Sequence, residues 1–160
     1  MNEKPNHREA QDEALKLLKL YNYEKPPIYP ETIARDFGIR IFLAALDSNI
    51  AGYYDFQEKI IYINQDDSPQ RQRFTIAHEL GHYVLHSEWV KTTDYKQLRR
   101  EVTTDTKELE ANTFAAHLLV PKAMLNKYRQ FAMKNELMEV FGVSGECIGK
   151  RLDFEEKYAR

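Results

Sequence analysis

His78, Glu79 and His82 form an HExxH motif, whose residue types and spacing suit metal binding and hydrolysis. In a helix, histidines four residues apart share one face and lie about 6 Å apart along the axis. Both imidazoles can then reach one ion at about 2.0–2.1 Å, the usual zinc–nitrogen distance. Glu79 lies about 100° around the helix from His78, which suits a general base acting on a metal-activated water. The motif therefore predicts a zinc site with hydrolytic chemistry.

The residues around the motif argue against a chance match, in which two surface histidines flank a solvated glutamate. Ser68 is an N-cap residue followed by Pro69 at the first helical position, so a helix start is encoded shortly before the motif. The middle of this helix is largely apolar, and a buried His-Glu-His group needs partners or a metal to compensate its desolvation. Gly81 costs a helix interior about 1 kcal/mol relative to alanine, which indicates that another element approaches closely there.

Hydrophobic periodicity predicts the elements that must position this motif. Apolar residues at helical spacing predict an amphipathic helix over 8–21 and a shorter one over 30–37. Short runs rich in β-branched and aromatic residues predict a small, mostly antiparallel three-stranded sheet, and an edge of such a sheet can hold a peptide as an added strand. These runs lie at 39–43, 50–56 and 59–64.

Further helices are predicted after the motif. Asp105 followed by Glu108 resembles an N-cap with its reciprocal partner, so a helix is expected to begin near Thr106 and to end at Val120. Another helix is expected over 122–134. Together with the sheet, these helices predict an α+β fold with a zincin-like arrangement.

The composition is that of one domain in a reducing compartment. The chain has 160 residues, 30% of them charged, and a net charge of −2, so no basic field points to nucleic acid or an anionic membrane. Cys147 is the single cysteine, which excludes an intramolecular disulfide. The polar N-terminus lacks the apolar core of a signal peptide, and no apolar run approaches the roughly 20 residues that span a bilayer. We expect a soluble, cytoplasmic protein without a membrane partner.

A catalytic zinc ion typically takes three protein ligands, so a third ligand must lie outside the HExxH motif. The extended motif HExxHxxGxxH is excluded, because Leu85 and Glu88 stand where it needs glycine and histidine. His86 continues the histidine series by one more turn, but about 12 Å of helix axis separates it from His78. That span is too long for one ion, so His86 is expected to pack beside the site.

The acidic residues of the later helix are the remaining candidates. Glu108 and Glu110 point about 160° apart, so at most one of them can face the metal. The apolar stripe of the helix does not choose between them, because each lies near one of its margins. His117 projects nearly in line with Glu110 but about 10 Å further along the axis, so it can line a cleft without sharing the ion.

Two segments, AHELGHYVLH and ELEANTFAAHLLVP, together resemble the ImmA/IrrE family of zinc peptidases. The family's later motif reads approximately E-A-N/D-x-F-A-x-x-L-L-x-P, and this sequence follows it from Glu110 to Pro121, with Val120 where methionine is common. The resemblance covers roughly residues 27–152. It implies one Zn²⁺ per chain, held by His78, His82 and Glu110, with Glu79 as the catalytic base.

The resemblance also implies a partner. Members of this family are cytoplasmic bacterial or prophage endopeptidases that cleave a helix-turn-helix transcriptional repressor of a mobile element or stress regulon. We therefore expect a specific protein substrate of that kind. Nothing in the periodicity or spacing of the residues indicates this substrate.

The C-terminal region supports a rival hypothesis, a DNA-binding or protein-binding regulatory module. Residues 136–152 resemble a helix-turn-helix unit, and we interpret the chain as a single domain, 1–160, whose peptidase body at about 8–135 carries this unit packed on it. Lys150 and Arg151 are the only basic residues of its second helix, so specific DNA binding is not expected. Arg99 and Arg100 belong to a polar stretch, 91–107, that is interpreted as a solvated loop rather than a nucleic-acid patch. A zincin-like module that has lost catalysis is a third alternative, against which the intact HExxH residues argue.

Overall fold

The computed structural model describes residues 3–92 and 105–158 of the chain. Most of the predicted polar stretch, including Arg99 and Arg100, lies outside the described residues. The strands are β1 (Arg40–Ala44), β2 (Gly52–Asp55) and β3 (Ile60–Asn64). The helices are α1 (His7–Leu20), α2 (Pro30–Asp36), α3 (Pro69–Leu85), the short 3-10 helix η1 (Trp89–Lys91), α5 (Thr106–Leu119), α6 (Lys122–Tyr128), α7 (Lys134–Phe141) and α8 (Gly145–Tyr158). These elements confirm the predicted α+β fold.

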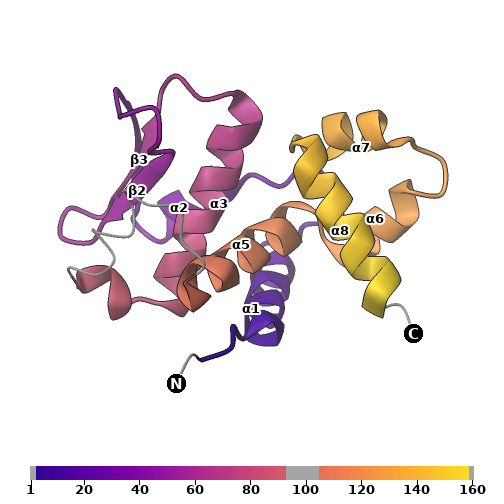
Figure 1. Ribbon diagram of the computed structural model, residues 1–160, viewed down its shortest axis with the longest axis horizontal. Coiled ribbons are helices and arrows are strands. Elements are labelled where there is room, and N and C mark those ends of the chain that lie inside the picture. Colours follow the sequence, from indigo (N-terminus) through magenta and orange to yellow (C-terminus); the bar gives the residue numbers. More distant parts are fainter. Residues whose placement is uncertain (1–2, 93–104, 159–160) are drawn as a thin grey trace.

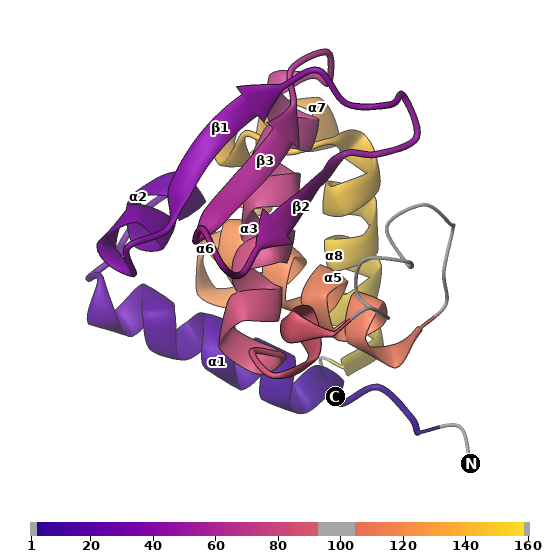
Figure 2. The ribbon, with the colours of Figure 1, turned by 90° about the vertical axis from the view of Figure 1, so that its left-hand side faces the viewer.

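The sheet has three strands among the described residues, as predicted, but its pairing is mixed. The strand order is β1-β3-β2, with β1 parallel and β2 antiparallel to β3, so the expectation of a mostly antiparallel sheet is corrected for β1. β3 takes the centre because four of its five residues are buried, whereas β1 is largely exposed. The chain leaves β1 through residues 45–51 and forms a hairpin only from β2 and β3. Figure 2 shows the sheet lying over α3.

Helix α3 carries the HExxH motif and lies between the sheet and α5 (Figures 1 and 2). Its start is the predicted one, because Pro69 is the first helical residue and the Ser68 hydroxyl accepts the backbone N–H of Arg71 at 3.2 Å. The predicted close approach at Gly81 is also confirmed. A Cβ atom at Gly81 would lie 2.9 Å from the ring of Phe114, so the glycine lets α5 pack directly on α3.

Helix α5 begins where the sequence predicts, with the Asp105 carboxylate accepting the backbone N–H of Lys107 at 2.8 Å. Helix α1 packs along α5, and Ala10 and Ala14 of α1 are fully buried there. Small side chains at this contact allow the two helices to approach closely. The packing of α1 and α3 on α5 thus fixes how α5 is rotated about its own axis.

The C-terminal region departs from the prediction in one respect. The helix expected over 122–134 is shorter, because α6 ends at Tyr128, and α7 from Lys134 is the first helix of the expected helix-turn-helix-like unit. Helix α7 ends at Gly142, whose φ of +66° is a left-handed conformation that suits glycine. Helices α7 and α8 pack on each other with residues 142–144 between them, on the right of Figure 1. In the described part of the chain, no helix is long and apolar enough to cross a membrane.

Arg151 of α8 links this region to the end of α5 by a hydrogen bond. Its side chain is 1% exposed, its Nε donates to the carbonyl oxygen of Val120 at 2.9 Å, and its Nη2 donates to Glu155 at 2.8 Å. Lys150, its neighbour, is exposed and pairs with Glu146 at 2.9 Å. The two basic residues considered for DNA contact therefore have different environments, and the guanidinium of Arg151 faces the interior.

Candidate metal centre

His78, His82 and Glu108 converge where α3 crosses the start of α5. The Nε2 atom of His78 lies 3.0 Å from Glu108 Oε2, and the Nε2 atom of His82 lies 2.7 Å from Glu108 Oε1. One potential ligand atom from each residue lies within 4.8 Å of the other two. Both histidines are buried and the carboxylate is half-buried, so the cluster combines three donors with restricted access to solvent.

Glu110, which the family resemblance implies as the third ligand, lies elsewhere. Its Oε2 atom is 2.6 Å from Nε2 of His86, and its Oε1 atom accepts the backbone N–H of Asn6 at 2.7 Å. Residues two apart on a helix point about 160° apart, so with Glu108 turned to the motif histidines Glu110 must face another way. The geometry therefore favours Glu108 over the predicted Glu110 as the third candidate ligand.

A neighbouring residue carried the signal that would have selected Glu108. Asn112 is one turn further along α5 and shares its face. Its side-chain oxygen lies 2.8 Å from Nδ1 of His78, on the side of the ring away from Glu108. An asparagine four residues after a ligand carboxylate can therefore orient the partner histidine, a role that the sequence interpretation missed.

Glu79 is fully buried, with 0% of its side chain exposed. It lies on α3 between the two histidines in sequence, about 100° from His78 and 60° from His82 around the axis. A carboxylate in this position is close to both imidazoles without being part of the converging set. This placement is compatible with the predicted role as a base.

The outer nitrogens of the two imidazoles are also engaged. Nδ1 of His78 faces the side-chain oxygen of Asn112, and Nδ1 of His82 lies 2.9 Å from Nδ1 of His86. When Nδ1 of a neutral imidazole donates its proton, Nε2 holds a lone pair. Without an ion, Nε2–H groups donate to Glu108, and a cation bound between the rings and the carboxylate would take the place of these protons. Two imidazoles and one carboxylate are the donor set of a catalytic divalent metal site, so these residues fit such an ion.

The charge states of the cluster suit a metal. Burial lowers the pKa of His82 to about 4, against the opposing effect of Glu108. Burial alone would raise the pKa of Glu108, but its hydrogen bonds with His78 and His82 outweigh burial and hold the pKa of this carboxyl far below its usual range. At neutral pH the imidazole of His82 is therefore neutral and Glu108 is ionised, the forms that bind metals.

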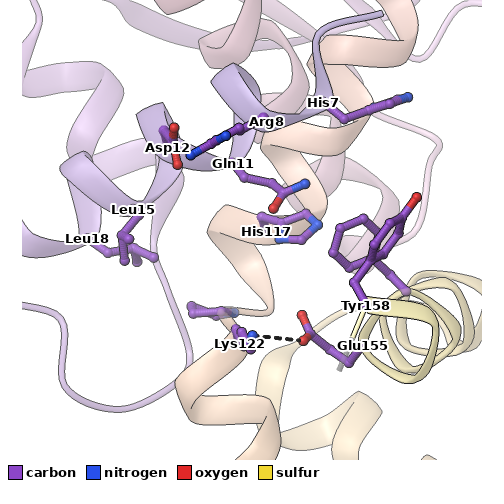
Figure 3. Close-up of a pocket in the computed structure, with 12 residues that line it drawn as sticks. His7, Arg8, Gln11, Asp12, Leu15, Leu18, His117, Lys122, Glu155 and Tyr158 are labelled. Carbon is purple, nitrogen blue, oxygen red and sulfur yellow. Dashed lines mark ion pairs between the residues drawn. The ribbon is translucent and has the colours of Figure 1, made fainter. Parts of the chain in front are cut away.

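The two remaining histidine candidates lie in different places. His86 is buried beside His82, and its ring also packs near the ring of Trp89. His117 lies nine residues beyond Glu108 on α5 and lines a separate cleft of about 1040 Å³ between α1, α5 and α8 (Figure 3). Its ring contacts that of Phe154 at 4.8 Å, and burial together with the charge of Arg151 lowers its pKa to about 3.

Comparison with known families assigns the chain. A model of peptidase family M78, described as the IrrE N-terminal-like domain, matches residues 34–153, which include all of α3 and α5. The chain belongs to the IrrE N-terminal-like family of metallopeptidases. Membership in this family implies a metal, and the structure offers a His-His-Glu cluster as its site. The predicted family relationship is therefore confirmed, while α1 lies before the matched residues.

Relatives of this IrrE N-terminal-like chain include named metallopeptidases. It is 36% identical over 88 residues to metallopeptidase ImmA of Bacillus subtilis, covering 52% of this chain and 49% of that protein. It is 31% identical over 103 residues to the radiation response metalloprotease IrrE of Deinococcus radiodurans, covering 62% of this chain and 28% of that protein. An uncharacterized immunity region protein 2 of Bacillus phage phi105 is 32% identical over 116 residues, which are 71% of this chain and 70% of the phage protein.

A solved structure shows the same fold. A transcriptional regulator from Mycobacterium tuberculosis superposes with a TM-score of 0.69 at 20% identity, covering 91% of this chain and 46% of the regulator. The IrrE N-terminal-like chain thus spans less than half the length of that structure and of the two named metallopeptidases.

Proposed function

We propose that this chain is a zinc-dependent endopeptidase. The observation that carries the proposal is the convergence of His78 and His82 on Glu108 beside the buried carboxylate of Glu79. His78, His82 and Glu108 would hold the ion, leaving a coordination position for water or substrate. When bound, zinc polarises the scissile carbonyl and lowers the pKa of a water to about 7.

The chain's own residues supply the remaining functions. Glu79 takes a proton from the attacking water at its carboxylate and passes it to the leaving amine. Asn112 holds the ring of His78 through Nδ1, which keeps its Nε2 atom directed towards Glu108. Burial keeps His82 neutral, and the burial of both histidines limits the access of bulk water to the ligand side of the site.

The proposed substrate is a helix-turn-helix transcriptional repressor in the cytoplasm of a bacterium, encoded by a prophage or another mobile element. Support comes from the relatives: one is a phage immunity region protein, and another is a radiation response metalloprotease. A peptidase that acts on one regulator also needs a surface that selects it. The helix-turn-helix-like unit over 136–152, packed on a peptidase body of about 8–135, offers such a surface.

A direct experiment is to incubate the zinc-loaded chain with the product of its neighbouring repressor-like gene and to map fragments by mass spectrometry. We expect one or a few cuts within the repressor, which disappear with a chelator. The Glu79→Gln variant, loaded with the same amount of zinc, is the control for contaminating proteases. Equal cleavage by this variant and the wild type would refute the proposal.

DNA binding through residues 136–152 is the alternative that the structure favours less. A base-reading helix must present basic or polar side chains to the DNA. Arg151 instead lies in the interior, bound to Val120 and Glu155, and Lys150 is paired with Glu146. The unit is therefore better suited to protein contact than to sequence readout.

A further inference from the structure

A continuous line of hydrogen bonds connects the candidate ligand His82 to the first turn of α1. Nδ1 of His82 lies 2.9 Å from Nδ1 of His86, whose Nε2 lies 2.6 Å from Glu110 Oε2. The other oxygen of Glu110 accepts the backbone N–H of Asn6, the N-cap residue of α1, at 2.7 Å. Three elements, α3, α5 and α1, thus contribute to one array that ends at a ligand nitrogen.

The direction of each hydrogen bond follows from its two ends. A carboxylate can only accept, so Nε2 of His86 carries a proton and donates it to Glu110. Nδ1 of a neutral His86 is then an acceptor, and Nδ1 of His82 must donate to it. When a metal ion takes the place of the proton between Nε2 of His82 and Glu108, His82 keeps its proton at Nδ1 and its lone pair at Nε2. The array therefore selects the tautomer of His82 that can bind a metal.

We propose that His86 and Glu110 are positioning residues that fix the tautomer and orientation of His82, and that the N-terminus of α1 is the outer anchor of this array. The inference rests on the proposed function, because it assigns a role in holding the same metal ion. It reaches beyond the residues matched by the family model, since Asn6 and α1 precede residue 34. Metal binding and docking of α1 are then coupled, and each stabilises the other.

Replacing Glu110 by glutamine tests the direction of the array with little change of shape. The carboxylate of Glu110 accepts from two donors, Nε2–H of His86 and N–H of Asn6. The glutamine amide has only one oxygen, so its NH₂ group must face one of these two donors and cannot accept from it. If the NH₂ group faces His86, that ring must protonate at Nδ1, and His82 must move its proton to Nε2. If it faces Asn6, the link to α1 is lost.

The measurement is Zn²⁺ affinity by competition with a chelating dye, on the full chain. We expect Glu110→Gln to bind Zn²⁺ about 10–100-fold more weakly than the wild type, the usual effect of losing a partner of a metal-binding histidine. The matched control is Glu9→Gln, the same substitution in α1 at a carboxylate that contacts the side chain of Asn6 and not Glu110. Imidazole ¹⁵N spectra of the Zn²⁺-loaded proteins report the proton position on His86, which we expect at Nε2 in the wild type and displaced in Glu110→Gln.

A second pair of variants tests the array from its outer end. Asn6→Pro and Asn6→Ala both remove the side chain that caps Glu9, but only proline removes the backbone N–H. The φ of Asn6, −90°, is close to the range of proline. We expect a further several-fold loss of Zn²⁺ affinity in Asn6→Pro relative to Asn6→Ala. We also expect added Zn²⁺ to slow hydrogen exchange at the amide of residue 6 in the wild type.

The outcomes separate the two proposals. If the wild type binds no Zn²⁺, the proposed function fails. If the wild type binds it and Glu110→Gln, Asn6→Pro and the controls all bind it equally well, the positioning array is refuted while the metal site stands. Should Glu110→Gln fail to fold, the comparison of the two Asn6 variants decides the matter alone.

Discussion

Glu108 and Glu110 lie two residues apart on α5 and contact different histidines of α3, Glu108 those of the HExxH motif and Glu110 the later His86. Because α3 crosses α5 at this point, one short acidic segment serves both the candidate ligand set and the array behind it. The two carboxylates look equivalent in the sequence but have different histidine partners in the structure.

This separation predicts different metal contents for two alanine variants. Glu108→Ala leaves two histidines, too few for a tight catalytic site, so we expect substoichiometric zinc after desalting and no turnover. Glu110→Ala keeps all three candidate ligands, so we expect it to retain zinc while binding it about 10–100-fold more weakly. Elemental analysis and zinc titration measure both. Retention of zinc by Glu108→Ala, with its loss in Glu110→Ala, would restore the assignment implied by the family motif.

Glu79→Gln should keep the fold and the metal but lose cleavage. The amide preserves the shape of the buried side chain but cannot accept a proton, and a general base contributes about 10²–10⁴-fold to the rate. Single-turnover cleavage of the repressor, with zinc content measured on the same sample, tests this expectation. A rate within twofold of the wild type would assign the base to another group.

Gly81→Ala should destabilise the protein although alanine favours helices. The added methyl group would lie 2.9 Å from the ring of Phe114, which is fully buried and cannot move aside freely. Overpacking costs about 1–3 kcal/mol, against about 1 kcal/mol gained in helix propensity. Urea denaturation measures the difference in free energy of unfolding. Adding Phe114→Leu should recover part of the loss only if this contact is its cause.

Arg151→Ala and Lys150→Ala form a matched pair that tests the C-terminal unit. Removing Arg151 leaves Glu155 buried without its closest charge partner, which costs about 3–5 kcal/mol. Lys150→Ala removes an exposed pair and should change stability by less than about 0.5 kcal/mol. Thermal or chemical unfolding measures both variants. Tight, sequence-selective and salt-sensitive DNA binding by the wild type, lost in Lys150→Ala, would instead favour the DNA-binding alternative.

The free energy of unfolding of the metal-free protein should decrease as the pH is lowered, because of His117. Its pKa is about 3 in the folded protein and about 6.5 when unfolded. As the pH falls below about 6.5 the unfolded chain binds the proton first, so stability is lost between about pH 6.5 and 3, by at most about 1.4 kcal/mol per pH unit. Between pH 7 and 5, the free energy of unfolding of His117→Gln should decrease less steeply than that of the wild type. An identical slope would mean that His117 is not protected from protonation.

Local signals predicted much of the fold. The start of α3 follows from Ser68 and Pro69, the start of α5 from Asp105, and the close contact of the two helices from Gly81. The two helix starts depend on residues that are near in sequence, and the close contact depends on the missing side chain of one glycine. Such features are visible before the fold is known.

Features set by distant contacts could not be predicted in the same way. The parallel pairing of β1 with β3 depends on which strand is most deeply buried, and this is known only once α3 covers the sheet. The choice of Glu108 over Glu110 depends on the rotation of α5 about its axis. That rotation is set by packing against α1 and α3 together, through residues such as Ala10, Ala14 and Gly81.

The shared face of Glu108 and Asn112 bears on how this gene can change in length. A single residue inserted between them would rotate one side chain by about 100° relative to the other, so that His78 could keep Glu108 or Asn112 but not both. Insertions and deletions within this one turn should therefore be eliminated even when every functional residue is retained. The number of residues between Glu108 and Asn112 is therefore constrained as strongly as the two residues themselves.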